Sequence, residues 1–151
     1  MQNFEILHRI ANALSLDEDA LALVVKEAGL ADRFPAPAGL MLDPDAEAHI
    51  PCDDPTMVAL LDGLIVTRRG PSPGAPPAPA RLNNNLVLKK LRIAMNLHDK
   101  QMLAIFESAG MHLGRNQLGA LFRAPGNKHL QACSDGTLIC FLTGLKRSMS
   151  A

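Results

Sequence analysis

The chain has 151 residues, 48% of them hydrophobic, so it is long enough to bury a core in one medium domain or two small ones. Only 3% of the residues are aromatic and Trp and Tyr are absent, so the core is expected to be aliphatic. The formal net charge is zero, but residues 1–66 hold three basic and twelve acidic residues, a charge of −9, and residues 67–151 hold twelve basic and three acidic ones, a charge of +9. A total of zero therefore does not exclude an anionic partner.

The cysteines are three in number, and none forms a Cys-x-x-Cys pair. An odd count in a chain of this length is not typical of a secreted disulfide framework. The first residues carry charged side chains where a signal peptide would need an unbroken apolar run, and no stretch reaches the length of a membrane span. We therefore expect a cytoplasmic protein without a membrane partner.

The N-terminal part of the sequence predicts two helices. Apolar residues recur at helical spacing from Asn3 to Leu14, which indicates a first amphipathic helix. Ser15, with Glu18 three residues later, resembles a capping box and predicts the start of a second helix, which Gly29 ends.

Proline dominates the next segments. Residues 30–53 hold four prolines, which limit any helix to a turn or two around Leu40. Asp54 followed by Pro55 predicts that helix begins again, with the carboxylate as cap and the proline in the first turn. Residues 70–80 consist of Pro, Gly, Ala and Ser, a composition typical of an extended linker.

The pattern of the first segments returns 81 positions later. At least thirteen identities match without a gap, and they include the helix-ending glycines Gly29 and Gly110 and the helix-starting aspartates Asp54 and Asp135. Such recurrence is typical of tandem units. We predict an all-α fold of two tandem copies of a small four-helix unit with a short third helix, packed about a pseudo-twofold axis, because a copy of about 60 residues is marginal alone. The predicted organisation is an acidic repeat at residues 1–69, a Pro-rich linker at residues 70–82 and a basic repeat at residues 83–151.

The second copy carries short motifs in a fixed order. They are Asn-Asn-Asn at 83–85, Leu-Lys-Lys-Leu-Arg-Ile-Ala at 88–94, Arg-Ala-Pro at 123–125, Lys128, Cys133, and Phe-Leu-Thr-Gly-Leu at 141–145. In these motifs, in the duplication and in the linker, the sequence resembles the YehS-like family, domain of unknown function 1456. The resemblance implies a small bacterial cytoplasmic protein with two helical repeats, and it implies no particular activity.

One polar stripe distinguishes the second copy. If residues 85–96 are helical, four side chains share one face because of their spacing: Asn85, Lys89, Arg92 and Asn96. The equivalent positions of the first copy hold Phe4, His8, Ala11 and Ser15. Two cations and two amides on one face can bind phosphate. The candidate anion- or nucleic-acid-binding surface is extended by Lys90, Arg115, Arg123 and Lys128.

This stripe leaves more than one interpretation open. It is also compatible with a solvated helix face, or with a face that pairs with the acidic copy. Since Tyr and Trp are absent, contacts with nucleic acid are expected to reach the phosphate backbone and not to stack on bases. The first hypothesis is a non-catalytic binding protein whose partner is nucleic acid or an acidic protein. The second is a protein-interaction module that forms a homo-oligomer through its acidic and basic copies.

The sequence predicts no enzyme, no cofactor and no metal site. His49 precedes Cys52 by three residues and His129 precedes Cys133 by four, but a structural zinc site normally needs four ligands. The recurrence of Cys52 at Cys133 indicates a packing role, because a free cysteine behaves as a small buried hydrophobe. The sequence also lacks a glycine-rich phosphate loop and the Gly-x-Ser-x-Gly and His-Glu-x-x-His motifs.

Overall fold

The computed structural model describes residues 1–71 and 81–150, and within these ranges the chain is helical without a β-strand. The predicted all-α class is therefore confirmed. The chain divides into two compact units, Met1–Leu82 and Asn83–Ala151. Most of the predicted linker, residues 72–80, lies outside the described residues. Within the described ranges no helix has the length and apolar character needed to cross a membrane.

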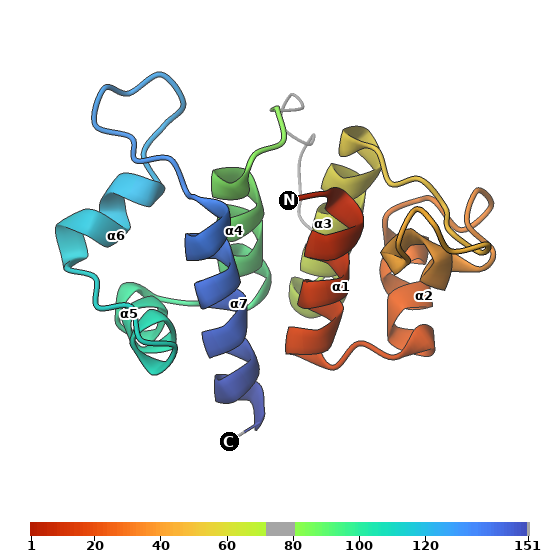
Figure 1. Ribbon diagram of the computed structural model, residues 1–151, viewed down its shortest axis with the longest axis horizontal. Coiled ribbons are helices and arrows are strands. Elements are labelled where there is room, and N and C mark those ends of the chain that lie inside the picture. The colour runs from red at the N-terminus through yellow and green to blue at the C-terminus, as the bar shows by residue number, and fades with distance from the viewer. Residues whose placement is uncertain (72–80, 151) are drawn as a thin grey trace. The chain divides into compact units, whose positions relative to one another are not determined.

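The first unit contains three α-helices and one short 3-10 helix, η1 (Figure 1). Their bounds are α1 Asn3–Leu14, α2 Glu18–Glu27, η1 Pro37–Met41 and α3 Asp54–Arg69. Helix α3 packs along α2, and η1 contacts both α1 and α2. The apolar face predicted for residues 3–14 is buried between these helices together with apolar side chains of α2 and α3, with Ile10, Leu21 and Leu60 each 1% exposed. The core of this unit is mostly aliphatic, as the composition predicts, with Phe34 as a buried aromatic side chain.

The second unit contains four α-helices in the same order of lengths (Figure 1). Their bounds are α4 Asn84–Ala94, α5 Asp99–Ser108, α6 Arg115–Leu121 and α7 Asp135–Ser150. Helix α7 packs along α5 and also contacts α4, while α6 contacts α5. Phe106 and Phe141 fill the middle of this core, with their ring centroids 5.5 Å apart.

The cap of α2 differs from the prediction. Asp17 has extended backbone, and its Oδ1 accepts a hydrogen bond from the Ala20 N–H at 2.8 Å. Ser15, the predicted cap, instead has a left-handed φ of 54° and ends α1. The sequence pattern misplaced the cap because three acids follow Ser15, and only the backbone conformation decides which of them faces the free N–H groups.

The residue that caps α3 also differs from the prediction. Asp53 is the cap: its Oδ1 accepts a hydrogen bond from the Thr56 N–H at 2.9 Å, and hydrogen bonds from Thr56 lower the pKa of the Asp53 carboxyl. Asp54, the predicted cap, accepts instead from Asn3 Nδ2 at 2.9 Å. The same amide donates to the main-chain carbonyl of Cys52 at 3.0 Å. Asn3 therefore fastens the first turn of α1 to the start of α3.

The second unit has the same contacts 81 positions later. Asn84 Nδ2 donates to Asp135 Oδ1 at 2.7 Å and to the Cys133 carbonyl at 3.1 Å. Ser134, not Asp135, supplies the side chain that accepts from the Thr137 N–H, at 3.1 Å. In both units the aspartate predicted as a cap is thus the acceptor that holds the first helix to the last.

A glycine in the last helix of each unit allows two helix backbones to touch. A Cβ added at Gly63 would lie 2.5 Å from the carbonyl oxygen of Val24, and one added at Gly144 would lie 2.0 Å from that of Ile105. Real Cβ atoms essentially never come so close to an oxygen, and the obstacle in each case is the main chain of another helix. Only glycine therefore fits at these two positions.

Gly144→Ala is expected to lower the free energy of unfolding by about 1–3 kcal/mol, because α7 must move away from α5 and loosen the core around it. Urea unfolding followed by circular dichroism measures the change. Gly119→Ala is the matched control: Gly119 is exposed in α6 with nothing within 4 Å of an added Cβ. That variant should be unchanged or up to about 1 kcal/mol more stable. Equal stability of the wild type and Gly144→Ala would contradict the close contact.

Candidate anion-binding surface

The predicted polar stripe begins on α4 but leaves it before its end. Asn83 caps the helix, with its Oδ1 accepting from the Leu86 N–H at 2.8 Å. Helix α4 ends at Ala94, two residues short of the predicted range. Asn96 has a left-handed φ of 52°, a conformation that asparagine tolerates better than most residues, and donates its N–H to Ile93 O. Asn96 therefore belongs to the turn and does not share the helix face.

Asn85 has a structural role. Its Nδ2 donates hydrogen bonds of 2.9 Å to the carbonyls of Leu121 and Gln131, and its Oδ1 accepts one of 2.8 Å from the Cys133 N–H. Both amide hydrogens and one lone pair are thus engaged with main-chain groups. Asn85 holds α4 against both ends of the loop between α6 and α7, so its amide is not available to an anion.

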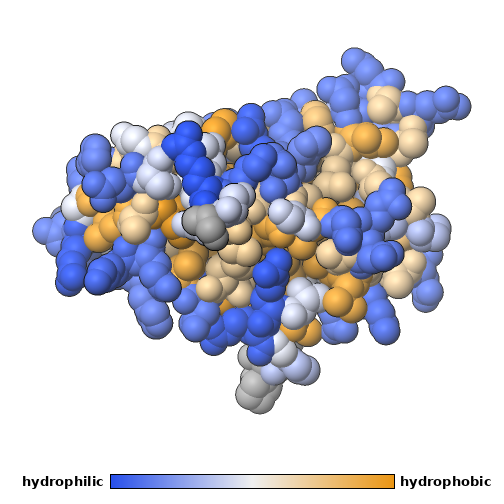
Figure 2. Space-filling model, turned by 90° about the horizontal axis from the view of Figure 1, so that it is seen from below, coloured by the Kyte–Doolittle hydropathy of each residue, from blue (hydrophilic) through white to orange (hydrophobic). Residues whose placement is uncertain are grey.

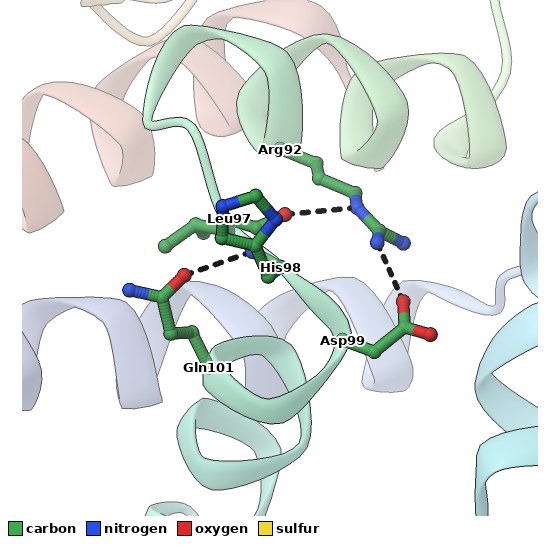
Figure 3. A network of polar contacts seen from close by, with 5 residues as sticks. All are labelled: Arg92, Leu97, His98, Asp99 and Gln101. Carbon is green, nitrogen blue, oxygen red and sulfur yellow. Dashed lines mark hydrogen bonds and ion pairs between the residues drawn. The ribbon is translucent and has the colours of Figure 1, made fainter.

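Arg92 is held at the turn between α4 and α5 (Figure 3). Its Nε donates to the Leu97 carbonyl at 3.0 Å, and one terminal nitrogen forms an ion pair with Asp99 Oδ1 at 2.5 Å. Its Cζ also lies 4.7 Å from the ring centroid of Phe122, a cation–π contact. The Arg92 side chain is only 26% exposed. It stabilises the turn, and little of its charge faces solvent.

The start of α5 completes this network. The main-chain N–H of His98 donates to Gln101 Oε1 at 2.8 Å, so the Gln101 side chain folds back over the first turn (Figure 3). Asp99 stands first in the helix, where a negative charge also interacts favourably with the helix dipole.

The remaining predicted residues are cations. Lys90 is half-buried and has an interaction partner. Four others are exposed: Lys89, Arg115, Arg123 and Lys128. Arg115 begins α6, and the last two lie in the loop between α6 and α7, which projects from the helices of its unit in Figure 1.

Lys89 and Arg123 are sequence neighbours of the residues that join α4 to the end of α6. Lys89 stands four residues after Asn85 and three before Arg92, so it shares their face of α4. Those two neighbours contact Leu121 and Phe122, the residues directly before Arg123. These contacts join α4 to the end of α6. Lys89 on α4 and Arg123, two residues after α6, are both exposed.

The charge of the second unit is not balanced within the unit. Residues 83–151 hold nine basic and three acidic residues, a net charge of +6, whereas residues 1–82 hold six basic and twelve acidic residues, a net charge of −6. Each of the three acids has a neighbour: Asp99 pairs with Arg92, Asp135 accepts from Asn84, and Glu107 lies 3.6 Å from the His112 ring. Among the described residues of this unit, the four exposed cations of the predicted surface have no side-chain hydrogen bond or ion pair, and the same holds for Lys100 in the first turn of α5.

Burial disfavours the thiolate form of the three cysteines. Burial raises the pKa of Cys52 and of Cys133 to about 11, and it also raises the pKa of Cys140. A thiol with such a pKa is almost wholly protonated at neutral pH, and the thiolate is the nucleophile and metal ligand. In the part of the chain that the structure describes, no three His, Cys, Asp or Glu side chains gather in a way that could hold a metal ion.

Comparison with known proteins agrees with the family resemblance seen in the sequence. A family model described as "Protein of unknown function (DUF1456)" matches residues 84–149, which include α4 to α6 and all of α7 except its last residue. The "Uncharacterized protein YehS" of Escherichia coli (strain K12) is 39% identical over 103 residues, an alignment that spans 67% of this chain and 66% of that protein. No solved structure matches significantly. Neither description names an activity. The chain belongs to the DUF1456 family, which includes YehS and whose function is unknown.

Proposed function

We propose that the protein is a non-catalytic helical binding protein whose second unit engages a polyanion, nucleic acid, mainly through phosphate groups. One observation carries the proposal: Lys89, Arg115, Arg123 and Lys128 are exposed in a unit whose three acids all lie next to other side chains. Exposed lysine and arginine side chains bind phosphates by displacing condensed counterions, without reading the base sequence.

We further propose an origin for the opposite net charges of the two units. The two units are tandem copies of one four-helix unit that have diverged in their surfaces. The Asn3 and Asn84 contacts, which recur 81 positions apart, support this view, as do the left-handed residues Ser15 and Asn96, with φ values of 54° and 52°. Binding of the anion then belongs to the basic copy.

Asn85 and Arg92 serve this function indirectly. Through Leu121 and Phe122 they hold the end of α6 against α4, so the segment that carries Arg123 is joined to the helix that carries Lys89. A polyanion would therefore meet cations from two separate segments, α4 and the loop after α6, on a preformed support. Preorganised cations lose less side-chain entropy on binding than cations on a disordered segment.

Lys89→Ala with Arg123→Ala is expected to weaken binding to mixed RNA and duplex DNA in electrophoretic shifts at several salt concentrations. For duplex DNA, each lost phosphate contact should reduce the slope of log K against log salt by about 0.9, so the double variant should lose roughly 2 from the slope. The matched control is Arg9→Ala with Lys26→Ala, which removes the same charge from exposed positions of the first unit and should leave the slope unchanged. No shift of either nucleic acid at low salt would contradict the proposal, as would equal weakening by both double variants.

Asn85→Ala tests whether Asn85 has a structural role that the exposed Lys89 does not share. The substitution leaves the Cys133 N–H and two carbonyls without their partner, so the free energy of unfolding should fall by about 1–3 kcal/mol in urea unfolding. Lys89→Ala should stay within about 0.5 kcal/mol of the wild type, because Lys89 is an exposed side chain. A loss of stability for Lys89→Ala as large as that for Asn85→Ala would show that Lys89 belongs to the structural network.

A second candidate function is self-association of the acidic unit of one chain with the basic unit of another. Opposite net charges on the two units favour it. Apolar side chains also reach the surface among hydrophilic ones (Figure 2), and four large ones are exposed by more than a third: Leu23, Leu42, Ile93 and Met149. Such residues are common in protein interfaces.

For this second function, sedimentation equilibrium should show a dimer or larger species at low salt that dissociates as salt is raised, because salt screens opposite charges. A species that remains monomeric at every salt concentration would exclude charge-driven self-association, and binding to nucleic acid would then be tested alone.

A further inference from the structure

The first unit has an open pocket at the end of α1. Its volume is about 320 Å³, and its lining consists of His8, Ala11, Asn12, Ser15, Leu16 and Met41. Ala11, 6% exposed, belongs to α1, and Met41 is the last residue of η1. All of the lining comes from the acidic unit.

By the 81-residue correspondence, the place of this pocket in the second unit belongs to the Arg92 side chain. Ala11 lies 81 positions before Arg92, and Met41 lies 81 positions before Phe122. In the second unit the Arg92 side chain lies over the Phe122 ring and reaches the Leu97 carbonyl. The first unit has a methyl group where this long side chain begins. The pocket is therefore the space that an arginine side chain takes in the other unit.

The turn that lines the pocket has the same main-chain conformation as the corresponding turn of the second unit. Ser15 and Asn96 both have left-handed backbone. The residue that follows each of them, Leu16 or Leu97, donates its N–H to the carbonyl five residues earlier, at 2.8 Å and 3.0 Å. Because the turns match, Leu16 presents its carbonyl as Leu97 does.

The carboxylate that pairs with the guanidinium also has a counterpart. Glu18 stands first in α2, as Asp99 stands first in α5, and Glu18 is exposed. Met41 offers a flexible apolar contact in place of the Phe122 ring, and the net charge of −6 on residues 1–82 attracts cations. The turn, a carbonyl acceptor and a carboxylate next to the lining are thus kept, whereas the arginine and the aromatic ring are replaced by Ala11 and Met41.

We infer that this pocket binds the guanidinium group of an arginine from another molecule, with the Leu16 carbonyl and the Glu18 carboxylate as acceptors. A guanidinium is planar and presents several N–H donors in fixed directions, so it can reach two acceptors at once while its face lies on an apolar side chain. A lysine ammonium has no such face, so the pocket prefers arginine. The ligand is either free arginine or an arginine side chain of a polypeptide.

The test is a titration of the full-length protein, labelled with ¹⁵N, followed by NMR. The probes are acetyl-Ala-Arg-Ala-amide and free L-arginine, with acetyl-Ala-Lys-Ala-amide as the control. The arginine peptide is expected to shift the amide signals of Ala11, Ser15, Leu16 and Met41, and to bind several-fold more tightly than the lysine peptide. Equal binding of free arginine would show that the amino acid itself is a ligand, whereas binding of the peptide alone would assign the pocket to an arginine within a polypeptide.

Three variants test the geometry. Met41→Phe restores the ring and should tighten binding of the arginine peptide about two- to fivefold, the range of an exposed cation–π contact. Glu18→Gln should weaken it about two- to fivefold, the range of an exposed ion pair. Ala11→Arg supplies the missing side chain from within the chain and should abolish binding. Met41→Phe is a gain of affinity, so a folding defect cannot imitate it.

The inference is overturned if the arginine peptide shifts none of these signals, if the lysine peptide binds as tightly, or if Met41→Phe and Glu18→Gln both leave the affinity unchanged. The pocket belongs to the acidic unit, so Glu18→Gln should not change the nucleic-acid shift assay. A pocket that does not bind arginine and a second unit that does not bind a polyanion can therefore be told apart.

Discussion

Each unit is closed by the side-chain amide of an asparagine in the first turn of its first helix. Asn3 and Asn84 donate to an aspartate and to a carbonyl at the start of the last helix, about 50 residues away in the chain. Apolar burial alone is non-directional, so it would allow the first helix to slide along the last. Two hydrogen bonds from one amide fix the register of these helices, and the turns, the loop and the exposed cations take their places from that register.

The helices and the buried face of the first one could be predicted from the sequence. Helical spacing of apolar residues predicted the buried face of α1 around Ile10, because burial of apolar side chains is the dominant driving force of folding and such residues recur once per helical turn. The sequence was not sufficient for the caps. Asp17 and Asp53 were missed because neighbouring acids have nearly the same intrinsic preference, and the backbone conformation chooses among them. The match of Asn3 with Asn84 could have been found from the 81-residue shift.

The candidate site was predictable only in part, for a related reason. Spacing along a helix tells which side chains share a face, and it placed Asn85, Lys89 and Arg92 together. It does not tell what lies opposite that face. The partners of Asn85 lie 36 to 48 residues away, and Phe122 is similarly distant from Arg92, so the engagement of these two side chains needed the tertiary structure. The exposure of Lys89 agrees with the expectation for a lysine on a polar helix face.

The contacts of Asn85 have a consequence for how this family can vary. The Asn85 side chain forms hydrogen bonds with main-chain groups of Leu121, Gln131 and Cys133. The loop between α6 and α7 is therefore closed at its base by a residue of α4, outside the loop. Residues within such a loop can be exchanged, inserted or removed at small entropic cost while the base stays fixed. Relatives that keep this asparagine can therefore alter the charge and length of the loop without disturbing the helices, so we expect the choice of partner to evolve here faster than the fold.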